Sequence, residues 1–181
     1  MSAPVIEVTT TDADATRDLG ARLVALLRPG DLVLLSGGLG AGKTTLAQGI
    51  GAAMDVRGRV TSPTFVIARV HPALGGGPDL IHVDAYRLTS LEEVDALDLD
   101  SSMDQAVTLV EWGQDKAEGL SPDRLEIEVG RPHGGVAGAA AGAPDGPMGT
   151  DLEDVDDGRR LVTVRGLGTR WADVDLRALA G

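Results

Sequence analysis

The sequence predicts an α/β fold with a mostly parallel central sheet, and three observations support this prediction. Residues 31–36 (DLVLLS) contain a continuous apolar run, which is typical of a strand buried on both faces. A glycine-rich stretch over residues 37–42 follows at once and leads into a helical pattern that starts at Lys43. A second apolar run, residues 106–110, ends at an acidic residue. Buried strands that alternate with helices are typical of α/β proteins.

The other elements can be assigned along the chain. Asp12 is the expected N-cap of a first helix, whose leucines follow helical spacing until Pro29-Gly30 ends it. An acidic helix is expected after Ser90, and a closing helix over residues 171–179. The remaining expected strands are residues 5–8, 64–70, 79–84, 124–129 and 161–165. The last two of these would pair as an antiparallel hairpin that extends the sheet.

Length and composition indicate one domain over residues 1–181. A chain of 181 residues with 43% hydrophobic and 24% charged residues can bury an ordinary core. The absence of cysteine excludes a disulfide scaffold, a thiolate metal site and a cysteine nucleophile. The sequence contains neither a basic, apolar leader nor an apolar run long enough to cross a membrane. We therefore expect a soluble, cytoplasmic protein with no membrane partner.

The net charge of the chain is negative, and its charged residues are unevenly distributed along the sequence. The chain carries 28 Asp and Glu against 16 Lys and Arg, for a net charge of -12, which opposes tight binding to nucleic-acid phosphates. Any role near RNA is thus expected to be indirect. Residues 133–158 are rich in Gly, Ala and acid and have little aliphatic bulk, which predicts a disordered loop insertion between the hairpin strands. The alternative is a functional acidic tether.

Residues 37–44 (GGLGAGKT) match the phosphate-binding pattern G-x-x-x-x-G-K-[ST] without a mismatch. Glycines let backbone N–H groups turn inward around phosphate oxygens, and the following helix contributes its positive N-terminal end. In such a loop the lysine, Lys43, reaches the β- and γ-phosphates, and the hydroxyl of Thr44 ligates Mg²⁺. The expected nucleotide contacts are Gly37, Leu39, Gly40, Ala41, Gly42, Lys43, Thr44 and Thr45.

Two acidic residues follow apolar strands on the expected sheet. Glu111 ends the strand at residues 106–110, and Asp84 ends the strand at residues 79–84. The carboxyl ends of parallel strands meet at the sheet edge that also carries the glycine-rich loop. A phosphate loop needs such acids to hold the metal with its water shell and to orient the attacking water. Lys43, Glu111 and Asp84 are therefore the candidate catalytic residues, although each acid could instead open an ordinary turn.

The segment after the phosphate-loop helix has the hydroxyls of a nucleotide-sensing switch. Thr61, Ser62 and Thr64 lie where related NTPases place the segment that senses the γ-phosphate, but an ordinary Ser-Pro turn explains them equally well. The chain contains no asparagine, which excludes the N-K-x-D motif that reads guanine. ATP is therefore the expected nucleotide.

Four further side chains have open assignments. His82 is interpreted as a strand residue and not as a ligand. The aromatic residues Phe65, Tyr86 and Trp112 either pack the strand ends or cover the nucleotide.

Four motifs in order resemble the TsaE (YjeE) family, the ATPase component of bacterial tRNA threonylcarbamoyladenosine synthesis. They are LGAGKTT at residues 39–45, VTSPTF at 60–65, HVDAYRL at 82–88 and LVEW at 109–112. The resemblance runs from the helix start at Asp12 to the strand at Arg159, apart from the insertion. The chain departs from the family pattern at Gly38, where an acid or Asn is usual, and at Gly113, where Pro is common.

The resemblance implies a three-layer P-loop NTPase fold that binds Mg-ATP and hydrolyses it weakly alone. It also implies TsaB and TsaD as partners, which together transfer a threonylcarbamoyl group to tRNA and are reset by ATP hydrolysis. Thr44 and Glu111 would hold Mg²⁺ and Asp84 would support the metal and its water. Thr61 to Thr64 would form the switch. The family's further nucleotide contacts match Asp12, Gln114 and Arg159.

Two other functions compete with this interpretation. A small-molecule kinase would need an arginine-bearing lid, but no arginine pair follows Glu111 at lid-like spacing. A nucleotide-gated adaptor without turnover would have no need of Glu111 and Asp84. Both alternatives are weaker than the ATPase assignment.

Overall fold

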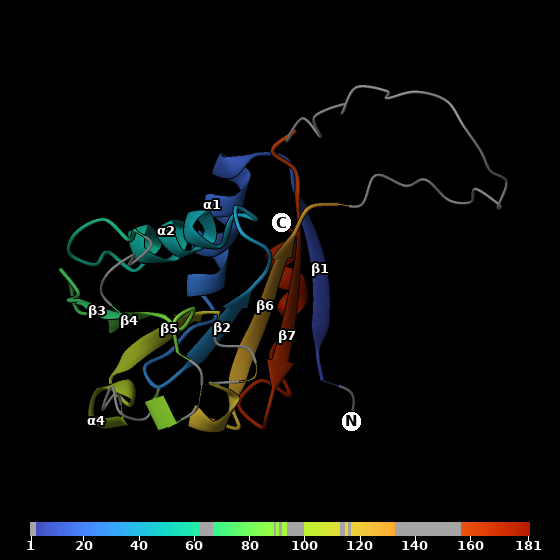
Figure 1. The fold of residues 1–181 in the computed structure, drawn as a ribbon. Helices are drawn as coiled ribbons and strands as arrows, with labels where there is room; N and C mark the ends of the chain where they lie inside the picture. Colours follow the sequence, from blue (N-terminus) through green and yellow to red (C-terminus); the bar gives the residue numbers. More distant parts are fainter. Residues whose placement is uncertain are drawn as a thin grey trace, which may run out of the picture.

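The computed structural model describes residues 3–61, 67–88, 90, 92–93, 100–112, 115, 117–132 and 157–181. Seven strands in these residues form one sheet in the order β1-β7-β6-β2-β5-β4-β3 (Figure 1). The strands are β1 Val5–Thr10, β2 Leu32–Ser36, β3 Ala68–His71, β4 Asp79–Asp84, β5 Ala106–Glu111, β6 Arg124–Gly130 and β7 Arg160–Leu167.

The four central strands are parallel. β2 pairs with β6 on one side and with β5 on the other, and β5 pairs with β4. Every residue of β5 and the first four of β2 are buried, as expected for strands covered on both faces. The predicted α/β class and the antiparallel hairpin of β6 with β7 are confirmed. The sheet is more mixed than predicted, because β1 and β3 are also antiparallel to their neighbours.

Two helices, α1 at Ala13–Val24 and α2 at Lys43–Ala53, lie side by side on one face of the sheet (Figure 1). Asp12 begins α1 as predicted, since its Oδ1 accepts a hydrogen bond from the Ala15 N–H at 2.8 Å. The helices approach closely at Gly20, where a Cβ would lie 2.6 Å from the carbonyl oxygen of Leu46. A glycine at this crossing lets α2, which carries Lys43 at its start, pack tightly against α1.

The main core fills the space between these helices and the sheet. Its fully buried members include Leu19 of α1, Leu46 and Ile50 of α2, and Leu35 and Leu109 of the sheet. The opposite face has a smaller core around Leu32, Leu34, Ile81, Val83, Met103 and Val110. Within the described residues, only short elements cover that face, among them α4 Asp100–Met103 and the 3-10 turn η1 Glu118–Leu120. The described residues therefore show one layer of long helices against the sheet.

The prediction of a C-terminal helix over residues 171–179 is wrong. Irregular turns follow β7, and a 3-10 helix, η2, spans Leu176–Ala180. Trp171, Leu176 and Leu179 are all buried in the main core. Residues five apart on an α-helix point about 140° away from each other, so one helix could not bury both Trp171 and Leu176. The chain turns between them instead.

The first helix also ends earlier than expected, at Val24 and not at Pro29-Gly30. A buried ion pair occupies the segment that follows it. Asp31 accepts hydrogen bonds from the Arg170 side chain at 3.0 and 3.1 Å, and Arg170 Nη2 also donates to the Leu26 carbonyl at 2.7 Å. The Leu26 carbonyl therefore faces Arg170 and does not continue the helix.

Some predicted elements lie partly or wholly outside the described residues. Of the strand expected at 64–70, the structure describes residues 67–70, and β3 begins at Ala68. Of the acidic helix, Glu92 and Glu93 are helical, and the Ser90 hydroxyl accepts a hydrogen bond from the Glu93 N–H at 3.3 Å. Most of the insertion at 133–158 falls outside the description. No helix in the described part of the chain is long and apolar enough to cross a bilayer.

We expect deletion of residues 134–157 to change the melting temperature by less than about 5 °C, because closure entropy depends only weakly on the length of the chain that connects two strands. Gly130 of β6 lies opposite Leu161 of β7, so the shortened connection still joins adjacent strand ends. Calorimetry of the deletion, beside a Gly/Ser replacement of equal length, measures the effect. If the melting temperature falls much more in the deletion than in the replacement, the length of this connection matters. If it falls strongly in both variants, the native segment contributes packing, which contradicts the prediction.

Candidate functional site

The glycine-rich loop at residues 37–42 joins β2 to the start of α2. Gly37, Gly40 and Gly42 have φ angles of 138°, 71° and 105°, a region that other residues rarely adopt. Gly42 is the N-cap of α2 and provides no side-chain cap. The first N–H groups of α2 are therefore not tied to a capping side chain, and a helix start of this kind favours anions.

Lys43 is the first residue of α2, and its ammonium group points back into the loop. Nζ donates to the carbonyl oxygens of Gly37 and Gly38, both at 2.9 Å, and lies 3.9 Å from the centre of the Trp112 ring. Burial lowers the pKa of the Lys43 ammonium below its ordinary value, and the carboxylates of Glu111 and Asp84 partly oppose this shift. A cation is thus held among the loop carbonyls, at the start of α2.

Glu111 and Asp84 end neighbouring parallel strands and lie opposite each other in the register of β5 with β4. Their predicted convergence on one sheet edge is confirmed. Glu111 is only 2% exposed, whereas Asp84 is half-buried and its Oδ1 accepts a hydrogen bond from the Tyr86 N–H at 2.9 Å. The negative charges of both carboxylates stabilise the charged form of Lys43, so the two acids interact electrostatically with the loop.

His82 lies in β4, as interpreted from the sequence, but it also has a role that the sequence did not suggest. Its Nε2 lies 3.0 Å from Oε1 of Glu111, and both side chains are almost completely buried. His82 and Asp84 are two residues apart on a strand, so their side chains share a face. That spacing was the available signal that the histidine faces the same edge as the acids.

Trp112 follows Glu111 and covers Lys43. Its backbone has φ of 60°, which is uncommon for a residue with a side chain, and its N–H donates to the Leu35 carbonyl at 3.0 Å. The ring meets Tyr86 edge to face at 5.3 Å between centres, and Tyr86 is 66% exposed. The sequence left open whether these aromatics pack the strand ends or cover the nucleotide site, and the Trp112 ring lies over Lys43 of the loop. Phe65 is outside the described residues.

A cavity of about 220 Å³ brings the candidate residues together. It is lined by Leu39, Gly40, Ala41, Gly42, Lys43, Thr44, Thr45, Glu111 and Trp112. Gly37, which was also predicted, lies at the start of the loop and binds Lys43 through its carbonyl. Thr44 lies in the first turn of α2 beside Lys43. The loop and Glu111 therefore face one space.

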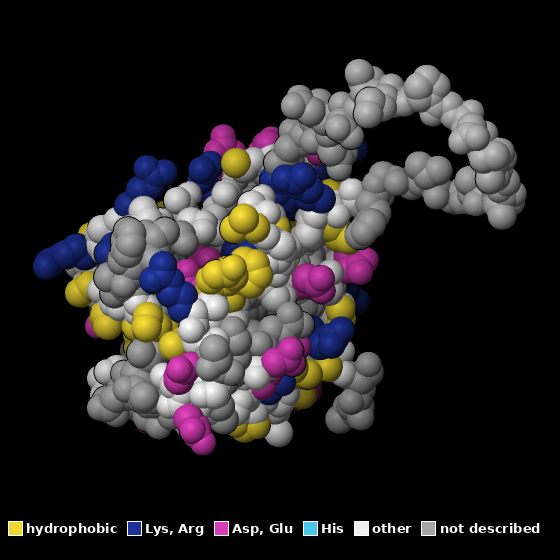
Figure 2. Space-filling view, in the orientation of Figure 1, with side chains coloured by type: hydrophobic (Ala, Val, Ile, Leu, Met, Phe, Trp, Pro, Cys, Tyr) yellow, Lys and Arg dark blue, Asp and Glu magenta, His cyan; other side chains and the backbone are white. Residues whose placement is uncertain are grey.

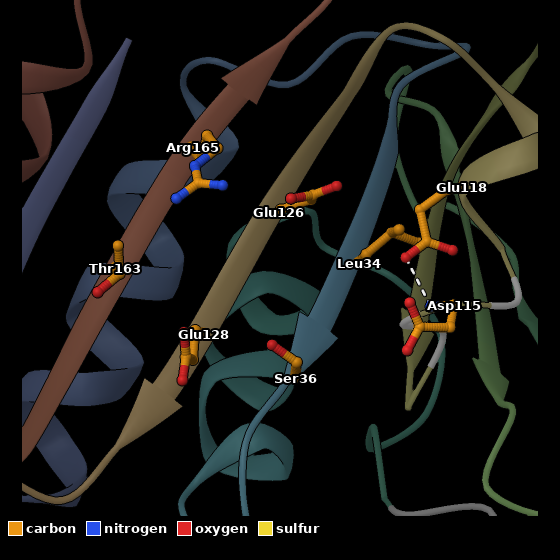
Figure 3. A pocket seen from close by; sticks show the side chains of 8 residues that line it. All are labelled: Leu34, Ser36, Asp115, Glu118, Glu126, Glu128, Thr163 and Arg165. Carbon is orange, nitrogen blue, oxygen red and sulfur yellow. Dashed lines mark hydrogen bonds between the residues drawn. The ribbon is translucent and has the colours of Figure 1, made fainter. Parts of the chain in front are cut away.

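A second cavity, of about 180 Å³, lies on the opposite face of the sheet (Figure 3). Its lining combines Glu126 and Glu128 of β6 with Asp115 and Glu118, and Arg165 is its cation. The Asp115 N–H donates to Oε1 of Glu118 at 2.6 Å, drawn as the dashed line in Figure 3. Among the described lining residues, four acids face one arginine, a balance that would repel a phosphate. The cavity at the glycine-rich loop is therefore the candidate site.

Several predicted contacts are not gathered at this cavity. Asp12 uses its carboxylate to cap α1, and the hydrogen bond from the Ala15 N–H lowers its pKa below the ordinary value. Arg159 is exposed and pairs with Asp157 at 3.5 Å. Thr61 is exposed at the edge of the described residues, while Ser62 to Thr64 and Gln114 lie outside them. The nucleotide contacts assigned to these residues stay predictions.

The residue next to Arg159 does reach the loop, which the sequence did not indicate. Arg160 donates from Nε to the carbonyl oxygen of Ala41 at 2.7 Å, across 119 positions of the chain. Arg159 directly precedes β7 and Arg160 begins it, and neighbouring residues of an extended segment point to opposite sides, so only the strand's orientation decides which of them faces inward. A long-range register of this kind has no local sequence signal.

Comparison with known proteins identifies the family. The family described as threonylcarbamoyl adenosine biosynthesis protein TsaE matches residues 10–135, which is more than half of the chain. The chain belongs to the TsaE family. A TsaE of Streptomyces coelicolor, named a tRNA threonylcarbamoyladenosine biosynthesis protein, is 54% identical over 166 residues, covering 91% of this chain and 99% of the relative.

More distant TsaE proteins show the same relationship. The TsaE of Bacillus subtilis is 36% identical over 123 residues, covering 67% of this chain and 75% of the relative. The crystal structure of YdiB from Bacillus subtilis superposes with a TM-score of 0.65 and 25% identity, covering 94% of this chain and 91% of YdiB. The family resemblance inferred from the four motifs is confirmed.

The buried His82–Glu111 pair leads to a prediction about stability. His82→Leu should lower the free energy of unfolding by about 3 kcal/mol, because it leaves a buried carboxylate without its hydrogen-bond partner among the described residues. The double variant His82→Leu/Glu111→Leu should regain most of this loss, because two apolar side chains replace the pair. Urea unfolding provides the measurement.

The matched control is His71→Leu, since His71 is also buried but its Nδ1 faces the Arg57 carbonyl and not a carboxylate. Its loss should be nearer to about 1 kcal/mol, the cost of an ordinary hydrogen bond. Equal losses at both histidines, with no recovery in the double variant, would contradict the pairing argument.

Proposed function

We propose that this TsaE-family chain is a Mg²⁺-dependent ATPase of the P-loop type that supports threonylcarbamoyladenosine modification of tRNA. The observation that carries the proposal is the single cavity lined by the glycine-rich loop, Lys43, Thr44 and Glu111. The parallel strands that form this edge, with α1 and α2 on one face, agree with a P-loop NTPase fold. The tRNA modification is proposed because the relatives are named tRNA threonylcarbamoyladenosine biosynthesis proteins.

The loop can bind the phosphates through groups that it already presents. The first N–H groups of α2, at the positive end of the helix, would donate hydrogen bonds to phosphate oxygens. Lys43 then exchanges its two carbonyl acceptors, on Gly37 and Gly38, for phosphate oxygens. Phosphate oxygens carry more negative charge than carbonyl oxygens, so the exchange favours the nucleotide complex.

The donor set suits Mg²⁺. Thr44 provides a hydroxyl, and Glu111 and Asp84 provide carboxylates, which are the oxygen ligands that this ion prefers. Within the described residues, no three His, Asp or Glu side chains gather into a metal-binding group. This agrees with an ion that is held by few protein ligands and mainly by phosphates and water. When bound, Mg²⁺ would neutralise charge that develops on the phosphates.

Glu111 is the residue best placed to orient the attacking water. His82 binds Oε1 and fixes the carboxylate in a buried position at the sheet edge. The second oxygen, Oε2, is then left for water or for the metal's water shell. Because hydrolysis at a P-loop depends on positioning more than on covalent chemistry, a rigid carboxylate serves this role.

Turnover by the isolated chain is expected to be slow. Among the described residues, no arginine lines the cavity, and Arg87, the nearest candidate in the motif at residues 82–88, is exposed. P-loop enzymes gain orders of magnitude in rate when a partner supplies the missing cation. The described lining of the cavity likewise contains no arginine of the kind that a small-molecule kinase would use to hold the transferred phosphate.

TsaB and TsaD are the proposed partners, and tRNA is reached only through them. Leu39, at the tip of the loop, is 92% exposed, and Tyr86 beside Trp112 is 66% exposed, so apolar surface surrounds the cavity mouth. On the face seen in Figure 2, hydrophobic side chains gather near the middle and are bordered by charged ones. Exposed apolar residues with a charged border are typical of protein docking surfaces. The net charge of -12 disfavours direct binding to tRNA.

Mg-ATP should bind to the wild-type protein and should bind at least about tenfold more weakly to Lys43→Ala, which removes the phosphate-contacting cation. GTP should bind less tightly than ATP. Titration calorimetry measures both, with Arg69→Ala as control because Arg69 is an exposed cation on β3. Unchanged affinity in Lys43→Ala would contradict the phosphate site.

Trp112 provides an independent readout of the same binding, because it lines the cavity while Trp171 is buried in the main core. The chain has two tryptophans. Mg-ATP should change the emission of the wild type and of Trp171→Phe, but not that of Trp112→Phe.

Depleting the protein in its own cells should lower threonylcarbamoyladenosine in bulk tRNA, measured by mass spectrometry. Wild type should restore the modification, whereas Lys43→Ala, which lacks the phosphate contact, and Glu111→Gln, which lacks the water-orienting carboxylate, should not. In parallel, purified TsaB and TsaD should raise ATP hydrolysis by the wild type. Normal modification after depletion would refute the role. If Lys43→Ala restores the modification, the protein still supports tRNA modification but does so without binding ATP through Lys43.

A further inference from the structure

Arg160 contacts the glycine-rich loop from behind. It is the first residue of β7 and is 9% exposed. Its Nε donates to the Ala41 carbonyl at 2.7 Å, and its Nη1 donates to the Arg159 carbonyl at the same distance. A Cβ built on Gly42 would lie 3.5 Å from Nε and 3.8 Å from Cγ of Arg160. The side chain therefore lies directly against the last two loop residues.

The cavity lies on the other side of these residues. Ala41 and Gly42 line it, and Arg160 does not. The arginine is therefore placed to act on the loop backbone and not to enter the space where a nucleotide would bind.

The planarity of the peptide bond determines what this contact does. The Ala41 carbonyl and the Gly42 N–H belong to one trans peptide group, in which C=O and N–H point in opposite directions. Arg160 holds the carbonyl away from the cavity, and the Gly42 N–H therefore points toward it. Backbone hydrogen bonds hold the peptide groups on either side, from the Ala41 N–H to the Gly38 carbonyl at 3.1 Å and from the Leu46 N–H to the Gly42 carbonyl at 3.0 Å. Arg160 holds the peptide group between them.

We propose that Arg160 is a positioning residue for the phosphate site, because its hydrogen bond to Ala41 fixes the peptide that presents the Gly42 N–H to the nucleotide phosphates. The inference rests on the proposed function, since it requires a phosphate ligand at the loop. It also connects the loop to the strand that follows the long insertion, because Arg160 begins β7 directly after that segment.

Arg165 supplies the matched control. It lies on the same strand as Arg160, carries the same charge, is exposed and lines the cavity on the opposite face of the sheet. Arg165→Met and Arg160→Met thus remove the same charge from one strand, but only the second removes the hydrogen bond to Ala41. Arg160→Lys keeps the charge but carries its N–H donors one atom farther along the side chain than Nε, whereas Arg160→Gln loses the charge and keeps an N–H donor bonded to Cδ, as Nε is.

The experiment measures Mg-ATP affinity by calorimetry and the Gly42 amide signal by ¹H–¹⁵N NMR. Arg160→Met should bind Mg-ATP about tenfold more weakly, the loss expected for one charge-assisted hydrogen bond, and should shift the Gly42 amide signal without nucleotide. Arg165→Met should bind within about twofold of wild type and leave that signal in place. Arg160→Lys should behave like Arg160→Met, and Arg160→Gln should recover part of the affinity.

Three results would overturn the inference: wild-type affinity in Arg160→Met, equal losses in the two Met variants, or full affinity in Arg160→Lys together with none recovered in Arg160→Gln, which would make the charge responsible. If Arg160→Met does not fold, the Lys and Gln variants decide. Better binding by Gln than by Lys supports the hydrogen bond, and the reverse order refutes it. Failure of the wild type to bind Mg-ATP would instead refute the proposed function.

Discussion

The pairing of β2 with β5 is the contact on which the candidate site depends. In this parallel register Leu35 lies opposite Glu111, and the Trp112 N–H continues the ladder by donating to the Leu35 carbonyl. The glycine-rich loop leaves β2 directly after Ser36, so the strand pairing alone brings the loop beside the acid. A shift of the register by one residue would turn Glu111 to the opposite face of the sheet. The buried apolar side chains of both strands, which fill the two cores, prevent such a shift.

The site keeps three polar side chains buried, and each is compensated differently. Lys43 is compensated by two loop carbonyls and the face of Trp112, and Glu111 by His82. His82 uses Nε2 for Glu111, while its Nδ1 is buried without a hydrogen-bond partner in the described part of the structure. A buried polar atom of this kind costs free energy. The arrangement therefore favours a fixed geometry at the sheet edge over maximal stability, which is usual where a site must be organised before its ligand arrives.

Much of the fold followed from local patterns. The apolar runs at residues 31–36 and 106–110 predicted buried strands, and the loop between strand and helix placed Lys43 correctly. The convergence of Asp84 with Glu111 followed from the rule for parallel strand ends. The C-terminal helix failed because Trp171 and Leu176 are buried by tertiary packing that helical spacing cannot satisfy. His82 and Arg160 act across 29 and 119 positions, so their partners depend on strand register, which a single sequence does not specify locally.

The loop is closed on itself by contacts that a bound phosphate would have to replace. The Lys43 ammonium group donates hydrogen bonds to the carbonyls of Gly37 and Gly38, and the Trp112 ring lies over it. Such contacts order the lysine before binding, which lowers the entropic cost of holding it in place. They also reduce the net gain from a phosphate, because the interactions exchanged are already favourable. If the loop binds phosphate as proposed, affinity comes largely from the N–H groups of the loop and helix start, which the backbone angles of the glycines orient.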